Sequence, residues 1–315
     1  MHKKVIDKTV TSDKALQSDV LQLYKTYDPP PKDFDPRTAS DKLLARYNIP
    51  RRPDPEREPK LARLWSRAFA RPPNFVKAEL SIDPVMSKRN PLRRLGPGFG
   101  PTGWGGVVVD AAAVGPPATF VTADWVVPRI VSLPLETANL GFWVGLDGFG
   151  NGQVLQAGIT ATANALDWPN IYCWAWTEWY TDQYKDPAVQ INNFSVSIGD
   201  TISVIVCAQQ PDLGYVMMLN VSTGQATRVG IPARPGITSQ GASAEWIVEC
   251  PSSSEFPAFW PVTFNECAAG GNGVLFDLTP NGFPVNITGD GGDQLTQTFI
   301  ASPDSAVVDW NGHWS

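Results

Sequence analysis

Short runs rich in Val, Ile, Thr, Trp and Tyr alternate with turn residues from residue 104 onward. Alternation of apolar and polar positions in such runs is typical of strands that are buried on one face. The segments IGD (198–200) and NVSTGQ (220–225) indicate hairpin turns. No helical pattern separates the runs, so the sequence predicts an all-β fold, an antiparallel sandwich or barrel. The predicted strands lie within 118–128, 141–148, 153–163, 171–180, 194–208, 214–231, 242–250 and 305–310.

The N-terminal third follows a different pattern. It is mostly irregular, with one short helix expected at 40–50, where Ser40 is the N-cap, and a second within 54–73. A basic joint rich in Gly and Pro separates it from the strands. We therefore divide the chain into an N-terminal extension and a β domain, residues 1–102 and 103–315.

Charge divides the chain at the same place. Residues 1–100 contain 21 Lys and Arg against 12 Asp and Glu, a balance of +9, whereas residues 101–315 contain 4 against 19, a balance of −15. We expect the extension to lie on the acidic domain at neutral pH and to loosen as carboxylates protonate, around pH ~4. Acidic residues are interspersed through the extension, which argues against a nucleic-acid partner.

Several chemistries lack the residues that they need. The only histidines are His2 and His313, so neither a Ser-His-Asp nor a Cys-His arrangement is expected. No motif for a zinc or other metal site is present, and we expect no cofactor. Cys250 and Cys267 bracket a short segment and are candidates for a disulfide, while the other two cysteines, Cys173 and Cys207, are expected to be buried as small apolar residues.

The first twenty residues contain no apolar stretch typical of a secretory leader, and no run approaches the roughly 20 apolar residues of a membrane span. We therefore expect no membrane partner, and the sequence by itself leaves the location open.

One acidic residue lies within an unusually aromatic segment, YCWAWTEWYTD (172–182). Successive side chains of a strand point to opposite faces. The smaller residues, at odd positions, suit an inner packed layer, and the even positions place large rings beside Glu178. Such rings can form the walls of a cleft for a peptide or a sugar. The even positions are Tyr172, Trp174, Trp176, Glu178 and Tyr180.

Four segments in order carry a resemblance to the glutamic peptidases of family G1, the eqolisins. They are FWVGLDG (142–148), QVLQAG (153–158), AWTEWYTD (175–182) and ASAEWIVE (242–249), and GWGGVVV (103–109) and TADWVVP (122–128) resemble the start of the same domain. The resemblance implies a β-sandwich of two packed, bent antiparallel sheets, similar to a jelly roll or concanavalin. It also implies a monomeric, secreted, acid-acting endopeptidase with polypeptide substrates and a removable basic propeptide.

In this family the catalytic pair is one Gln and one Glu, which the resemblance places on Gln156 and Glu178. Ionised Glu178 would take a proton from water and pass it to the leaving amine, and Gln156 would donate an N–H to the developing oxyanion. The extension would act as an inhibitor that acid releases.

Other residues on these motifs have two interpretations each. Asp147 either orients Gln156 or water, or is a turn residue before Gly148. Glu245 either lines the cleft or faces solvent. The large rings form subsite walls or pack in the core, namely Trp143, Tyr172, Trp174 and Trp176.

Two other functions fit an aromatic cleft. The first is a carbohydrate-binding or glycoside-hydrolysing sandwich, in which Glu178 would act with Asp147 or Glu245 as the two carboxylates. The second is a binding module without catalysis. Neither has a particular use for Gln156.

Overall fold

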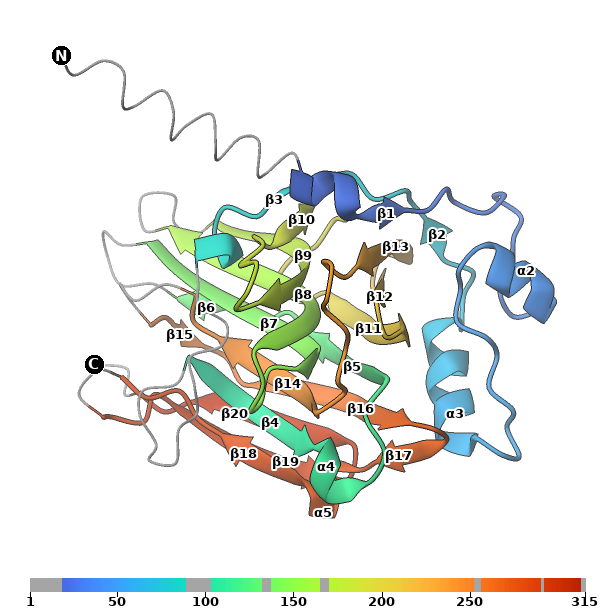
Figure 1. Cartoon of the computed structure of the whole chain (residues 1–315). Helices are drawn as coiled ribbons and strands as arrows, with labels where there is room; N and C mark the ends of the chain where they lie inside the picture. The colour runs from blue at the N-terminus through green and yellow to red at the C-terminus, as the bar shows by residue number, and fades with distance from the viewer. Residues whose placement is uncertain are drawn as a thin grey trace.

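The protein is described here from a computed structural model that covers residues 19–88, 103–131, 137–164, 170–251, 256–289 and 292–312. We call residues 19–88 the arm and the described residues from 103 onward the body. The body consists of two large β-sheets packed face to face, with the arm along one side (Figure 1). The predicted β-sandwich is therefore confirmed.

Sheet A is ten-stranded, and all its pairs are antiparallel except one. Its main path is β1 (Lys25–Thr26), β13 (Gln225–Pro232), β12 (Leu213–Asn220), β11 (Thr201–Gln210), β5 (Phe120–Val126), β16 (Val262–Gly271), β20 (Ser305–Trp310) and β19 (Thr296–Ser302). Outside this path, β17 (Val274–Phe276) pairs with β16, and β2 (Asn74–Phe75) pairs in parallel with β13.

Sheet B is eight-stranded and antiparallel. Its order is β18 (Gly282–Val285), β4 (Trp104–Asp110), β14 (Ser243–Glu249), β7 (Thr137–Asp147), β8 (Gln153–Asn164), β9 (Ile171–Thr181), β10 (Val189–Ile191) and β3 (Leu80–Ile82). A separate ribbon pairs β6 (Ile130–Val131) with β15 (Ala258–Phe259).

Helices are short and few among the described residues. None of them is long and apolar enough to cross a membrane. They are a helical turn at residues 19–23, α2 (Asp41–Arg46), α3 (Pro59–Ala68), η1 (Met86–Lys88), α4 (Ala111–Val114) and α5 (Leu278–Asn281). The expected N-cap is confirmed, because the Ser40 side chain accepts a hydrogen bond from the Leu43 N–H at the start of α2.

Alternation along the strands fills the space between the two sheets with apolar side chains. On the inner face of sheet B these include Leu155, Ala157 and Ile159, and on that of sheet A Ile202, Val204 and Val206. Trp246 links the two layers, since its buried indole N–H donates to the Thr122 carbonyl of sheet A at 3.0 Å. The outer face of sheet B takes no part in this packing and can therefore carry a functional site.

The arm contacts both sheets. Its strands β1 and β2 pair with β13 at one edge of sheet A, and β3 pairs with β10 at an edge of sheet B. Between these strands, α2 and α3 lie on the outer face of sheet A, where a second apolar cluster forms. Leu44, Trp65 and Phe69 of the arm pack there with Met217 and Leu219 of the body.

Ion pairs connect the basic arm to the acidic body, as the division of charge along the chain predicts. Arg63 of α3 pairs with Glu266 at 3.3 Å and Asp304 at 3.1 Å, and Arg67 also pairs with Glu266. Lys60 pairs with Asp277 at 2.8 Å. Helix α3 is therefore held by a row of body carboxylates.

Two details of the sequence analysis are corrected. NVSTGQ does form the turn of the β12–β13 hairpin, but IGD is a turn that precedes β11 and closes no hairpin. None of the four cysteines forms a disulfide in the structure, so the predicted bond between Cys250 and Cys267 is absent. Cys267 lies in β16 of sheet A, whereas Cys250 follows β14 of sheet B, and the segment between them crosses from one layer to the other.

Candidate active site

Register across four adjacent strands places three polar side chains in one row. Glu245 of β14 lies opposite Gly145 of β7, Gly145 opposite Gln156 of β8, and Gln156 opposite Glu178 of β9. Directly opposed residues point to the same face of a sheet. The row lies on the outer face of sheet B, away from sheet A, since its neighbours Trp246 and Ala157 point into the sandwich core.

Gly145 carries no side chain in this row. A Cβ at this position would lie 3.3 Å from the Gln156 Cβ and 3.0 Å from the Trp143 ring. The Trp143 ring and Gln156 thus approach closely over the glycine, where a larger residue would crowd them. Glu245 and Gln156 flank Gly145 from neighbouring strands, with no other side chain between them in the row.

Gln156 is held firmly and is fully buried. Its Nε2 donates to a Glu178 carboxylate oxygen at 2.8 Å, and its backbone carbonyl accepts from the Thr177 hydroxyl at 3.0 Å. A carboxylate only accepts, so contact with Glu178 fixes which end of the amide is the donor. The Oε1 atom has no hydrogen-bond partner among the described residues.

Glu245 is fully buried, and neither of its carboxyl oxygens has a partner of hydrogen-bond geometry in the described part of the chain. Burial raises the pKa of Glu245 well above its usual value. The Ser243 hydroxyl and the Phe149 N–H nearby favour the ionised form and oppose this rise of the pKa, and the charge of Asp147 adds to it. A buried, unpaired carboxyl group with a strongly shifted pKa is a feature of functional sites.

Asp147 holds a loop. It has a positive φ of 68° before Gly148, and its carboxylate accepts four hydrogen bonds. The donors are the Asn151 side chain, the Ser239 hydroxyl and the N–H groups of Gln240 and Ala242. These bonds join the turn after β7 to the segment before β14. Asp147 therefore acts as a turn residue and as a tie between two loops beside the row.

The aromatic segment alternates as predicted. Ala175 and Trp179 pack in the sandwich core, and Trp176 and Tyr180 belong to a cluster on the outer face. Trp143 of the neighbouring strand joins this outer cluster and is fully buried, as is Trp176.

Two further aromatic residues lie toward the edge of the sheet. Tyr172 is 51% exposed, and the Trp174 N–H donates to the Asp83 carboxylate of the arm at 2.6 Å. Trp174 is therefore occupied by the arm in this structure, while Tyr172 is open to solvent.

Two acidic residues of this face were not singled out from the sequence. Glu249 is buried and accepts from the Trp143 indole at 3.0 Å. Glu249 follows Glu245 by four residues, so both lie on the same face of β14. This spacing could have identified Glu249 from the sequence. Asp83 lies in the arm, and nothing in its local sequence indicates a contact with Trp174. No three His, Cys, Asp or Glu side chains of the described segments form a metal-binding group.

The fold is thus a two-sheet sandwich with a buried amide and buried carboxyl groups on the outer face of one sheet. The chain matches the Peptidase A4 family over residues 102–310, about two thirds of its length, and belongs to that family of glutamic peptidases, the eqolisins. It is a peptide hydrolase. This assignment confirms the resemblance and decides against the carbohydrate and binding alternatives.

Known proteins agree with the assignment. Aspergillopepsin-2 of Aspergillus niger is 27% identical over 228 residues, covering 62% of this chain and 77% of that protein. Scytalidopepsin B of Scytalidium lignicola is 28% identical over 148 residues, covering 43% of this chain and about half (53%) of that protein. In fold, the chain is similar to scytalido-glutamic peptidase with a transition state analog inhibitor, with a TM-score of 0.55, 21% identity and coverage of 66% and 98%.

The pKa of Glu245 makes a prediction for stability. Because the folded chain binds this proton more tightly than the unfolded chain, the free energy of unfolding falls as pH rises above about 4.3, until the folded pKa is passed. A Glu245→Gln variant has no ionisable group at this position, so its free energy of unfolding does not fall with pH for this reason. The variant should therefore gain stability relative to the parent by up to about 1.4 kcal/mol per pH unit above that point, with no such gain below it. Urea unfolding at a series of pH values measures the difference, and a difference independent of pH would contradict the buried, protonated state.

Proposed function

We propose that this peptide hydrolase is an acid-acting endopeptidase that cleaves by direct attack of water, with Gln156 and one glutamate of the same row as its catalytic pair. The support is the row itself, in which an amide donor with fixed orientation lies beside carboxyl groups on one face. No histidine takes part, since the sequence has only His2 and His313. An amide keeps its donor at any acidic pH.

Geometry favours a different glutamate from the one that the resemblance suggested. Glu178 is in direct hydrogen-bond contact with Gln156, so no water fits between these two side chains. A general base must instead reach a water that also faces the oxyanion donor. Glu245 meets this requirement best, because Gly145, which carries no side chain, is the only residue between it and Gln156 in the row, and both its oxygens lack partners in the described residues. We therefore propose Glu245 as the base and Glu178 as the residue that positions Gln156.

The reaction then runs in two steps. Glu245 takes a proton from water, whose oxygen attacks the peptide carbon while the free N–H of Gln156 stabilises the oxyanion. Glu245 next gives the proton to the leaving amine as the C–N bond breaks. The first step needs an ionised carboxylate in acid, so the pKa of Glu245 must fall from its raised value when the face opens to water and substrate.

Three variants test these roles. Each is assayed with an unfolded protein as substrate from about pH 3 to 7, the range in which carboxyl groups titrate. We expect Glu245→Gln and Gln156→Ala to lower kcat by about 10²–10³-fold or more, because they remove the base and the oxyanion donor. Glu178→Gln should lower it less, by about tenfold, because a Gln side chain retains an oxygen that accepts from Gln156. Loss of all activity in Glu178→Gln with retention in Glu245→Gln would assign the base to Glu178, and intact activity in all three would reject the amide–carboxylate mechanism.

The arm is proposed to inhibit the enzyme through its last described turn. Asp83 is fully buried and accepts from the N–H groups of Val85 and Met86 as well as from Trp174. Met86 packs in the outer cluster and lies 3.0 Å from the position of a Cβ on Gly141. This turn therefore occupies the outer face of sheet B beside the aromatic residues of the site.

Cutting the chain after this turn tests inhibition. A site for a specific protease, inserted within residues 94–98 of the full chain, allows the connection to be cut without other changes. We expect peptide hydrolysis near neutral pH to rise at least about tenfold on cutting, since the turn can then leave the site. An uncut chain carrying Asp83→Asn, which weakens the contact with Trp174, should show part of this rise. Equal activity before and after the cut at every pH would exclude inhibition by the arm.

A further inference from the structure

The arm is built into the fold far more extensively than inhibition requires. Only its end, from Asp83 to Met86, contacts the outer face of sheet B around Trp174 and the outer cluster. The preceding residues pair with sheet edges and cover the outer face of sheet A, on the opposite side of the sandwich. We propose that residues 19–82 stay bound after the chain is cut between 88 and 103, so that the working enzyme is a non-covalent complex of two chains.

Backbone pairing supplies the first support. The arm covers one edge of each sheet, because β1 and β2 pair with β13 and β3 pairs with β10. Departure of the arm would leave both edges unpaired, which proteins generally avoid. Around β3 the pairing continues into side chains, since Asn193 donates to the Lys77 carbonyl and accepts from the Glu79 N–H.

Apolar burial supplies the second support. Ala78 is part of the core between the two sheets, and Tyr24 and Leu80 pack against it. On the outer face of sheet A, Phe75 is 7% exposed within the second cluster. Because arm residues fill the main core as well as an outer cluster, their removal would expose apolar surface in two places.

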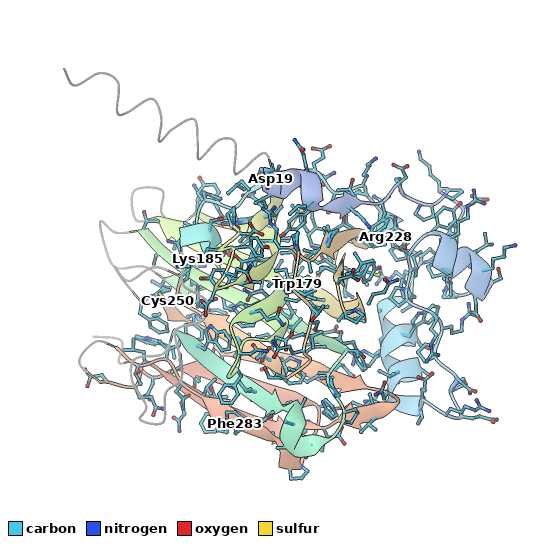
Figure 2. The ribbon with its side chains drawn as sticks, viewed as in Figure 1. Asp19, Trp179, Lys185, Arg228, Cys250 and Phe283 are labelled. Atoms are coloured by element: carbon cyan, nitrogen blue, oxygen red, sulfur yellow. The ribbon has the colours of Figure 1, made fainter. Side chains whose placement is uncertain are left out.

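A buried cation of the body is enclosed by the arm. Arg228 is 1% exposed, and its Nη2 donates to the Asp28 carbonyl at 3.0 Å. Its guanidinium lies 4.8 Å from the centre of the Phe75 ring and 5.9 Å from that of Tyr27. Figure 2 labels Arg228 on the side of the body that the arm covers. Neither a carbonyl nor these cation–π contacts titrate in acid, so this attachment persists where carboxylate pairs fail.

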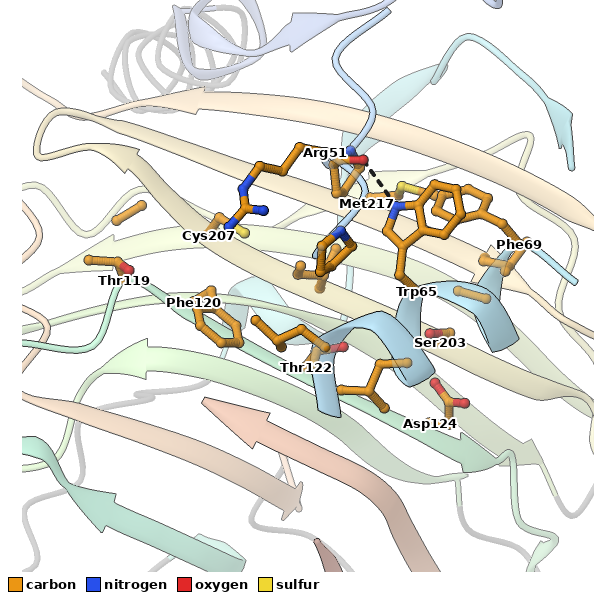
Figure 3. A pocket seen from close by; sticks show the side chains of 18 residues that line it. Arg51, Trp65, Phe69, Thr119, Phe120, Thr122, Asp124, Ser203, Cys207 and Met217 are labelled. Carbon is orange, nitrogen blue, oxygen red and sulfur yellow. Dashed lines mark hydrogen bonds between the residues drawn. The ribbon is translucent and has the colours of Figure 1, made fainter. Parts of the chain in front are cut away.

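The attachment of α3 is weaker and depends on pH. Its cations pair with body carboxylates, and the side chains of Arg63 and Arg67 are more than half exposed. A cavity of about 380 Å³ also lies where α3 meets the outer face of sheet A, lined by Trp65 and Phe69 of the arm and by Phe120 and Met217 of the body (Figure 3). Acid should therefore loosen α3 while the strands and the Arg228 attachment remain. The outer face of sheet A is thus an interface for the chain's own N-terminal fragment.

The test uses the full chain with the inserted protease site and with Gln156→Ala and Glu245→Gln, so that the cut never depends on the chain's own activity. After cutting at neutral pH, size-exclusion chromatography and native mass spectrometry are run at pH 7 and at about pH 4. We expect the two fragments to elute together at a ratio of one to one at both pH values. Elution of the body fragment alone, at either pH, would overturn the proposal.

Variants check that the retained complex is the one described. In the cut chain, Phe75→Ala should speed dissociation of the fragments by about tenfold, because it removes a ring over Arg228 and part of the outer cluster. Lys185→Ala changes another, exposed cation of the body and should leave the rate unchanged. Equal rates in both variants would overturn the Arg228 attachment. If Phe75→Ala does not fold, Phe75→Leu, which keeps the apolar contact and loses the ring, replaces it.

Discussion

The register of β14, β7, β8 and β9 is the constraint on which the site depends. Glu245, Gln156 and Glu178 come from three strands, and only direct opposition across Gly145 brings them into one row. A slip of one residue in any pair would turn one of these side chains into the sandwich core. The core prevents such a slip, because the same strands carry Trp246, Ala157 and their apolar neighbours on the inner face. Packing between the sheets thus sets the chemistry outside them.

The two outer faces of the sandwich carry different features. The outer face of sheet B carries the row of Glu245, Gln156 and Glu178, and the outer face of sheet A carries most of the arm. One polypeptide segment can therefore stabilise one face while its end contacts the other. The carboxylates that hold α3 respond to acid, whereas the contacts of Arg228 do not.

Several features of the fold and of the candidate site could be predicted from the sequence. Alternation gave the faces of 171–181 correctly, and the four motifs led to the family and to Gln156. The choice of glutamate could not be made in this way, because Glu178 and Glu245 both occur in aromatic, apolar segments. Only pairing between strands reveals that one contacts Gln156 and the other faces it across a glycine. Long-range contacts such as Asp83 with Trp174, and the separate sheets of Cys250 and Cys267, also depend on tertiary structure.

The most direct test of the account is the pH dependence of kcat/KM for the arm-cut enzyme and its Glu178→Gln variant. The acidic limb of this profile reports ionisation of the essential base in the free enzyme. If Glu245 is that base, the limb persists in Glu178→Gln, at reduced overall rate and with little change in its midpoint. If the limb disappears in Glu178→Gln, ionisation of Glu178 controls the reaction, and the assignment of the base to Glu245 is wrong.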